Sequence, residues 1–184
     1  MSTANSPGRL LRYTISIYRN KSSSSDVAEN FSREYVKKIA PLHAKHGMEM
    51  YQIVYSPLAY RTALDSINRR DGRGFIVDDH DVTVEFYFRS FAELSRVTSD
   101  PEFQAAQAAE APYVNLVHTV VSLGWVEKYV DGGRVVNIGD DGKSAYPSWA
   151  ELGDISTAFP KEDVAGATKW SVEGPGGTGE LKTQ

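Results

Sequence analysis

The chain has 184 residues, of which 41% are hydrophobic and 11% aromatic, and its formal net charge is -4 at pH 7. This composition predicts one domain with a hydrophobic core plus extensions, and it excludes a basic surface for nucleic acid or for an anionic membrane. There is no cysteine, which excludes a disulfide framework, a thiolate nucleophile and a cysteine-based zinc site. Residues 1–8 are polar, lack the apolar core of a signal peptide and are expected to be disordered, so we expect a cytoplasmic protein.

The first two elements are predicted from hydrophobic periodicity. Residues 10–19 alternate between apolar and polar side chains, as in a half-buried strand. After a serine-rich loop, Asp26 and Glu29 have the spacing of a capping box that opens a helix. Apolar side chains then recur at helical spacing, and Gly47 is predicted to end the helix. The members of this helical stripe are Val27, Phe31, Tyr35 and Ile39.

Three further elements follow in the middle of the chain. Residues 48–55 alternate and predict a second strand, and residues 57–68 predict a short helix with proline near its start. After a loop rich in turn residues, residues 82–89 show the cleanest alternation in the sequence. They predict a third strand.

The last helical region is predicted to start with a second capping box, formed by Ser90 and Glu93. Asp100 followed by Pro101 predicts that the helix restarts there, with aspartate as N-cap and proline in the first turn. Residues 116–129 predict the final strand, which a turn at residues 131–133 follows.

The order of these elements predicts an α+β domain of ferredoxin-like βαββαβ type over residues 9–136. In this fold the long helices cover one face of an antiparallel sheet, and we expect the apolar strand positions beneath them. The opposite face is amphipathic, so we predict that it meets the same face of a second subunit. The expected members of that face are Thr14, Ser16, Tyr18, Thr83, Glu85, Tyr87 and Arg89.

The composition changes after the domain. Glycine, aspartate, serine and proline dominate residues 137–184, as in a linker. Trp149, Phe159 and Trp170 are apolar exceptions in this segment. They predict that this C-terminal extension packs in places on the domain or on the partner subunit.

Several stretches resemble one known family. They are residues 34–47 in the first helix, 79–86 at the third strand, 99–103 in the later helix, and 123–125 with 131–136 at the end of the domain. With this order and spacing, the chain resembles a fungal member of the EthD-domain group in the dimeric α+β barrel superfamily.

The resemblance implies a homodimer whose two sheets close into a barrel, with a small-molecule pocket between each sheet and its helices. It also implies no metal and no organic cofactor. Fungal relatives are associated with decarboxylation, and the wider superfamily with aldol-type cyclisation or cofactor-free oxygenation of aromatic polyketides. One position departs from the pattern, because many relatives have histidine where this chain has Ile39.

Histidine is the usual acid/base group near neutral pH, and the chain has four. His43 and His46 lie three residues apart at a helix end, yet a third ligand at diagnostic spacing for a metal is missing. His46 is a candidate for catalysis or for helix capping. His80 and His118 are our further candidates for the acid/base group. His80 lies between two aspartates, and we expect His118 to be partly buried in the last strand and to line the pocket.

The predicted substrate-binding residues carry hydroxyl, guanidinium and indole groups. Tyr51, Tyr55 and Tyr87 can donate hydrogen bonds to a phenolate or enolate oxygen, or serve as packing residues. Arg61 can hold a carboxylate through its planar fork. Trp125 can serve as a stacking platform for the substrate or as a packing residue of the core.

These observations favour a cofactor-independent enzyme that acts on an aromatic or polyketide-derived small molecule, with decarboxylation as the first prediction. Cyclisation, isomerisation and cofactor-free oxygenation of the same substrate class are the alternatives within the enzymes. The rival from another class is a dimeric small-molecule binding protein without activity. The absence of a histidine at Ile39 favours this rival.

Overall fold

The computed structural model describes residues 7–22 and 24–154 of the chain. Its strands are β1 (Leu11–Arg19), β2 (Met50–Tyr55), β3 (Val82–Phe88), β4 (Val114–Trp125), β5 (Val130–Asp131) and β6 (Arg134–Val135). Its helices are α1 (Ser25–Lys45), α2 (Leu58–Arg70), α3 (Phe91–Thr98), α4 (Pro101–Ala108) and α5 (Trp149–Leu152).

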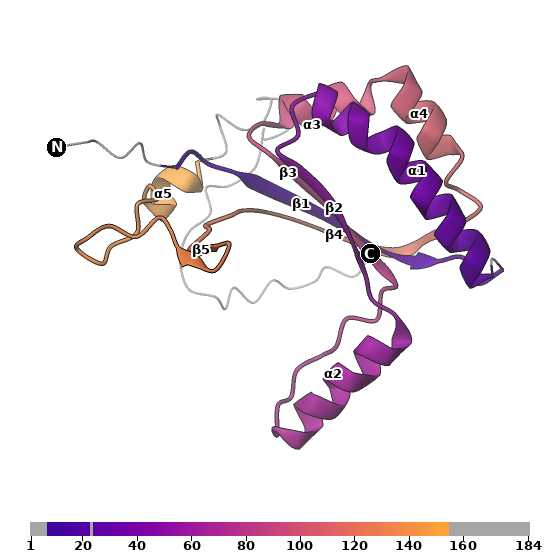
Figure 1. The fold of residues 1–184 in the computed structure, drawn as a ribbon, viewed down its shortest axis with the longest axis horizontal. Coiled ribbons are helices and arrows are strands. Elements are labelled where there is room, and N and C mark those ends of the chain that lie inside the picture. Colours follow the sequence, from indigo (N-terminus) through magenta and orange to yellow (C-terminus); the bar gives the residue numbers. More distant parts are fainter. Residues whose placement is uncertain (1–6, 23, 155–184) are drawn as a thin grey trace, which may run out of the picture.

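The four long strands form one antiparallel sheet in the order β2-β3-β1-β4. Helix α1 and the pair α3 and α4 lie together on one side of this sheet (Figure 1). This strand order, with one helical crossover after β1 and another after β3, is the ferredoxin-like α+β fold. The predicted fold class is therefore confirmed for the single chain.

The register of the strands decides which side chains meet the helices. Tyr51 pairs with Phe86, Phe86 with Tyr13, and Tyr13 with Leu123, so these side chains share one face of the sheet. The core forms between this face and the helices, which confirms the predicted orientation of the apolar positions. The buried members of the core are Leu11, Ile39, Leu42, Met48, Phe86, Phe88, Val97 and Phe103.

The opposite face of the sheet carries a network of polar side chains around Glu85. The Glu85 carboxylate is 5% exposed and accepts hydrogen bonds from Arg12, Gln52 and Tyr87. Burial opposes its charge, but these donors outweigh burial and hold the pKa of Glu85 below its usual value. Beside it, Thr14 bonds to Ser122 over 2.6 Å.

The helix starts differ in part from the predictions. Helix α1 is capped by Ser24, whose side chain accepts from the backbone of Val27, so the predicted start at Asp26 is wrong by two residues. Ser90 is the N-cap of α3 but makes no side-chain cap bond. The predicted cap at Asp100 is confirmed, because its side chain accepts from the backbone of Glu102 over 2.9 Å.

Strand β4 contains an irregularity that its sequence does not announce. Its pairing with β1 shifts between Ser16, which faces Val120, and Tyr18, which faces Asn115. Four residues of β4 therefore lie opposite a single residue of β1, and within this bulge His118 adopts a left-handed backbone with φ of 63°. A bulge of this kind re-aims the side chains that it contains.

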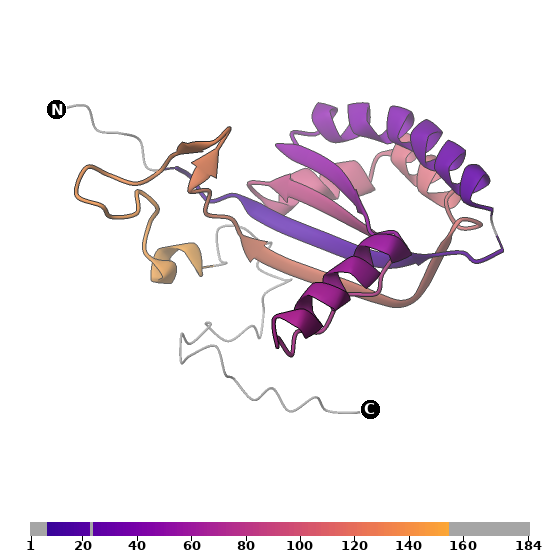
Figure 2. The same ribbon diagram turned by 60° about the horizontal axis from the view of Figure 1, so that its bottom comes forward.

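Two parts of the chain lie at the periphery. Helix α2 projects away from the sheet, and the hairpin β5–β6 and α5 lie near the start of β1 (Figures 1 and 2). There Arg9 donates to the carbonyl of Leu152 over 3.0 Å, and Trp149 contacts Trp125 edge to face.

The other residues expected to anchor the extension, Phe159 and Trp170, lie outside the described residues, as do residues 1–6. Across residues 7–22 and 24–154, no helix is both long enough and apolar enough to cross a membrane.

Candidate functional site

A cavity of about 1050 Å³ lies between the inner face of the sheet and the helices. This volume lies just above the range of pockets that enclose drug-sized ligands, about 300–1,000 Å³. Aromatic side chains line much of it, so its walls suit a flat, largely apolar molecule. These side chains are Tyr13, Tyr18, Phe31, Tyr35, Tyr51, Tyr55, Phe86, Phe91, Phe103 and Tyr113.

His43 is the buried imidazole of this cavity. It is 2% exposed and lies in the last turns of α1, one helical turn beyond Ile39. Its ring packs 4.4 Å from that of Tyr51 and meets Phe86 and Phe103 edge to face. Neither ring nitrogen has a hydrogen-bond partner among the described residues.

The surroundings of His43 decide its charge. Burial disfavours the imidazolium, and electrostatic repulsion from His46 adds to this effect. Together they lower the pKa of His43 to about 4. At neutral pH the ring is therefore neutral, with one nitrogen free to accept a proton. A buried acceptor without a partner costs stability, and such groups are common where a ligand supplies the missing bond.

Tyr51 lies beside His43 on the second strand. Burial is the main cause that raises the pKa of Tyr51 above its usual value, and repulsion between the tyrosinate and the ionised form of Glu110 adds to it. The phenol therefore stays protonated at neutral pH and can donate a hydrogen bond to an oxygen atom in the cavity.

Glu110 and Tyr35 form a second pair on the cavity wall. Tyr35 comes from the middle of α1, and Glu110 from the turn between α4 and β4. The phenol of Tyr35 interacts with the Glu110 carboxyl, which adds to the effect of burial in raising the pKa of Tyr35. Burial raises the pKa of Glu110, and the interaction with Tyr35 offsets this rise only in part.

Two predicted substrate-binding residues lie where the cavity reaches α2. The Tyr55 hydroxyl bonds to that of Ser32 on α1. The Arg61 guanidinium donates to the backbone carbonyl of Asp79 and to the Asp81 carboxylate, while its buried Nε has no partner among the described residues. Both side chains line the cavity, as Tyr51 does.

His46 lies outside the cavity, although the sequence placed it on one helix face with His43. Its Nε2 is 2.8 Å from the carboxylate of Asp100, which also accepts from Lys45 over 2.9 Å. These bonds hold the pKa of Asp100 below its usual range. They join the end of α1 to the start of α4, so the geometry of His46 is that of a helix-end contact.

His80 is buried but does not line the cavity. Its Nδ1 is 2.5 Å from Asp78, its Nε2 is 3.0 Å from the carbonyl of His118, and its ring packs against Tyr18. Burial opposes the charged ring, but the two acceptors outweigh burial and raise the pKa of His80. The ring therefore ties the loop before β3 to the bulge of β4.

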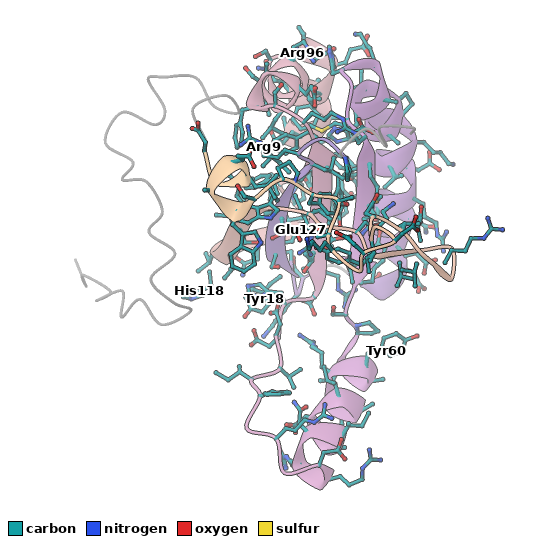
Figure 3. All side chains as sticks on the ribbon, turned by 90° about the vertical axis from the view of Figure 1, so that its left-hand side faces the viewer. Arg9, Tyr18, Tyr60, Arg96, His118 and Glu127 are labelled. Atoms are coloured by element: carbon teal, nitrogen blue, oxygen red, sulfur yellow. The ribbon has the colours of Figure 1, made fainter. Side chains whose placement is uncertain are left out.

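His118 is exposed, so the prediction that it is partly buried and lines the pocket is wrong. It lies at the outer margin of the molecule (Figure 3). The bulge of β4 and the left-handed backbone at His118 explain the difference, because they break the alternation from which burial was inferred.

Tyr87 and Trp125 also lie away from the cavity lining. Tyr87 bonds to Glu85 on the opposite face of the sheet, at 3.1 Å. The Trp125 indole donates to Glu127 over 3.1 Å and packs against the edge of the core.

One group of possible metal ligands occurs in the described part of the chain, formed by Asp78, Asp79 and His80. Both ring nitrogens of His80 already bond to protein oxygens, and the Asp79 carboxylate accepts from Tyr18. The contacts of this group are thus explained by the loop that it holds together.

The sequence contained a signal for His43 but none for Glu110. Phe31, Tyr35 and Ile39 follow one another at intervals of four, and the next member of this series is His43. By contrast, Glu110 stands in an alanine-rich turn without apolar periodicity, and Tyr35, which interacts with its carboxyl, comes from a distant helix.

Comparison with known proteins identifies the family. Residues 22–116 match the model of the EthD domain, and the chain belongs to this family. A protein of Aspergillus terreus named "Putative oxygenase" is 42% identical over 145 residues, which are 78% of this chain and 91% of that protein. The conidial pigment biosynthesis dehydratase EthD of Metarhizium robertsii is 26% identical over 141 residues, which are 73% of this chain and 95% of that protein.

A solved structure is also similar in its backbone. It is a dimeric protein of unknown function with a ferredoxin-like fold from Bacteroides fragilis, with 8% identity and a TM-score of 0.45. The match covers 64% of this chain and 96% of the other.

Proposed function

We propose that the protein is an enzyme that binds an aromatic or polyketide-derived carbonyl compound in the cavity, removes a proton from carbon and eliminates water. The observation that carries this proposal is His43, a buried and neutral imidazole without a protein partner on the cavity wall. A group of this kind is a general base that needs no prior deprotonation at neutral pH. The name of the Metarhizium relative, a dehydratase, supports the loss of water.

The steps balance with side chains of this chain. His43 accepts the proton from the carbon next to the carbonyl, and the electron pair moves to the carbonyl oxygen. Tyr51 donates a hydrogen bond to this oxygen, which stabilises the enolate. The enolate then re-forms the carbonyl and expels the hydroxyl on the neighbouring carbon, which takes up one proton and leaves as water. The imidazolium loses its proton, and the enzyme returns to its starting state.

Decarboxylation, the reaction that the sequence favours, needs a group that gives a proton to a ring carbon. Because its pKa is lowered, His43 is unprotonated at neutral pH and has no proton to give to a ring carbon. We therefore rank decarboxylation below dehydration as the proposed reaction. Cyclisation and isomerisation would start with the same removal of a proton from carbon.

Oxygenation is a second candidate, which the name of the Aspergillus relative favours. It would also start with a carbanion, which then reacts with dioxygen. The consumption of dioxygen during turnover separates it from dehydration.

Two bicyclic probes with a common product distinguish the main reactions. Loss of water converts 3-hydroxy-1-tetralone into 1-naphthol, and loss of carbon dioxide converts 1-hydroxy-2-naphthoic acid into the same 1-naphthol. We expect the purified protein to form 1-naphthol from the hydroxytetralone faster than from the acid, and to exchange deuterium from solvent into C2 of 1-tetralone. Binding of both probes without exchange or turnover would instead indicate the non-catalytic binding protein.

We further propose that the protein is a homodimer joined through the sheet face that carries Glu85. The network on this face satisfies the buried carboxylate, and the exposed apolar side chains of Val54 and Val120 border it. The register places Val120 opposite Ser16, on this same face. A two-fold axis would bring equal patches together, so the interface would bury these apolar side chains of both copies.

Val120→Lys is expected to weaken this dimer by at least about 30-fold in Kd, because it places a charge in an apolar contact on both copies. Sedimentation should show the wild type at about twice 20.3 kDa and the variant shifting toward the single mass on dilution. Ala105→Lys, on the exposed side of α4, is the matched control and should sediment as the wild type. A wild type that sediments as a single chain would refute the dimer.

A further inference from the structure

The cavity has a second ionisable end that the proposed proton removal does not use. Glu110 lies on the cavity wall in the turn before β4, and its carboxyl interacts with the phenol of Tyr35, which lines the same cavity. Its turn is held by the backbone bond from Tyr113 to the Glu110 carbonyl, at 2.9 Å, and the Tyr113 ring stacks on Phe31 with centroids 3.9 Å apart. The turn that carries Glu110 therefore has a defined place opposite α1.

We propose that Glu110 is the proton donor to the leaving hydroxyl and that Tyr35 positions its carboxyl. This assignment rests on the proposed dehydration and adds the acid that the departing oxygen requires. Tyr35 is a positioning residue in this scheme, because it acts through the carboxyl with which it interacts.

The arrangement of the three groups suits a substrate longer than one ring. Tyr35 and His43 are eight residues apart on α1, so their backbones are separated by roughly 12 Å along the helix axis. Tyr51 packs against His43, and its phenol also interacts electrostatically with the Glu110 carboxyl. A fused bicyclic hydroxyketone that lies along α1 can therefore meet the base, the enolate donor and the acid at different positions.

The protonation states agree with these roles. Burial favours the neutral carboxylic acid of Glu110 and thereby raises its pKa, whereas burial favours the neutral imidazole of His43 and lowers its pKa. Environments that raise the pKa of one group and lower that of another are typical of acid and base partners in an active site.

The proton count closes over one turnover. The C–H bond breaks as His43 gains the proton, and the C–O bond breaks as the Glu110 O–H proton moves to the hydroxyl oxygen. Water and the unsaturated ketone leave, and the ketone tautomerises to the naphthol in the case of the tetralone probe. The imidazolium then releases one proton to solvent, and the Glu110 carboxylate takes one up.

The test separates the acid from the base by using a probe without a leaving group. Glu110→Gln should lower the rate of 1-naphthol formation from 3-hydroxy-1-tetralone by about 100-fold or more. The same variant should still exchange deuterium into C2 of 1-tetralone at the wild-type rate, which also shows that it is folded. Glu102→Gln, on the exposed first turn of α4, is the matched control and should leave both rates unchanged.

Tyr35→Phe tests the positioning role through the pH dependence of the dehydration rate, which loss of a purely structural contact would leave unchanged. The interaction with Tyr35 lowers the pKa of Glu110, so removal of the phenol hydroxyl should raise that pKa further. The rate of dehydration falls as pH rises through the pKa of the acid, so this alkaline limb should move to higher pH in the variant.

Each remaining outcome decides against a specific claim. If Glu110→Gln dehydrates the probe as fast as the wild type, or if the alkaline limb of the rate stays in place in Tyr35→Phe, the role of Glu110 is overturned and the proposed function stays intact. A wild type that neither exchanges deuterium nor forms 1-naphthol from the hydroxytetralone would overturn the proposed function together with this inference.

Discussion

His43→Phe is expected to lower kcat/KM for the dehydration of 3-hydroxy-1-tetralone by about 10²- to 10⁴-fold, because it removes the general base. It should lower the deuterium exchange of 1-tetralone to a similar extent, since exchange needs the same removal of a proton from carbon. The fold should tolerate the change. The ring lies among Tyr51, Phe86 and Phe103, and phenylalanine leaves no buried nitrogen without a partner.

The matched control is His46→Gln, three residues further along α1. The imidazole of His46 contacts the Asp100 carboxylate outside the cavity, so the variant should keep the wild-type rates. Both rates should be measured together with a thermal melt of each variant. Full activity in His43→Phe, or loss of activity in His46→Gln without loss of stability, would contradict the assignment of the base.

The second large effect concerns the stability of the protein in acid. A pKa of His43 that falls from 6.5 in the unfolded chain to about 4 in the folded protein means that the unfolded chain binds the proton first. The free energy of unfolding should therefore decrease as pH falls from about 6.5 to about 4. The difference between these pKa values corresponds to about 3 kcal/mol.

Urea unfolding of the wild type and of His43→Phe at pH 7.5 and pH 4 isolates this effect. Glu110 acts in the opposite direction, because its raised pKa stabilises the folded protein at low pH and this contribution is lost as pH rises. Asp100 is ionised in the folded protein to lower pH than in the unfolded chain, and its contribution is lost only in stronger acid. Both groups are present in both proteins, so they cancel in the difference.

The wild type is thus expected to lose about 3 kcal/mol more than the variant between the two pH values. An equal loss in both proteins would show that His43 is not held neutral by burial. The same titration predicts the acid limb of the reaction rate. The base is lost as pH falls through about 4, so dehydration by the wild type should decline there.

The buried histidine also bears on the non-catalytic alternative. The departure at Ile39 favoured a binding protein, since many relatives carry histidine at that position. Ile39 is buried in the core and gives the cavity wall an apolar side chain, and the imidazole on this wall comes one helical turn later, from His43. The chain therefore keeps a histidine on the cavity side of α1, which supports the enzyme.

Local sequence patterns predict the four long strands, the helices between them and their order. Strands with strict alternation, such as residues 82–89, predicted both the sheet and the face that the helices cover, because a period of two assigns every side chain to one face. The cap at Asp100 was also visible, since its side chain bonds to a neighbour only two residues away. Local chemistry of this kind needs no knowledge of distant contacts.

The tertiary structure alone decided which polar groups face the cavity. Two histidines three residues apart on α1 have opposite surroundings, because His46 meets Asp100 whereas His43 meets aromatic rings. The bulge that exposes His118 arises from the pairing of β4 with β1. The burial that raises the pKa of Glu110 comes from the enclosure of its turn against α1. Such effects depend on contacts between residues far apart in the chain, which no local pattern records.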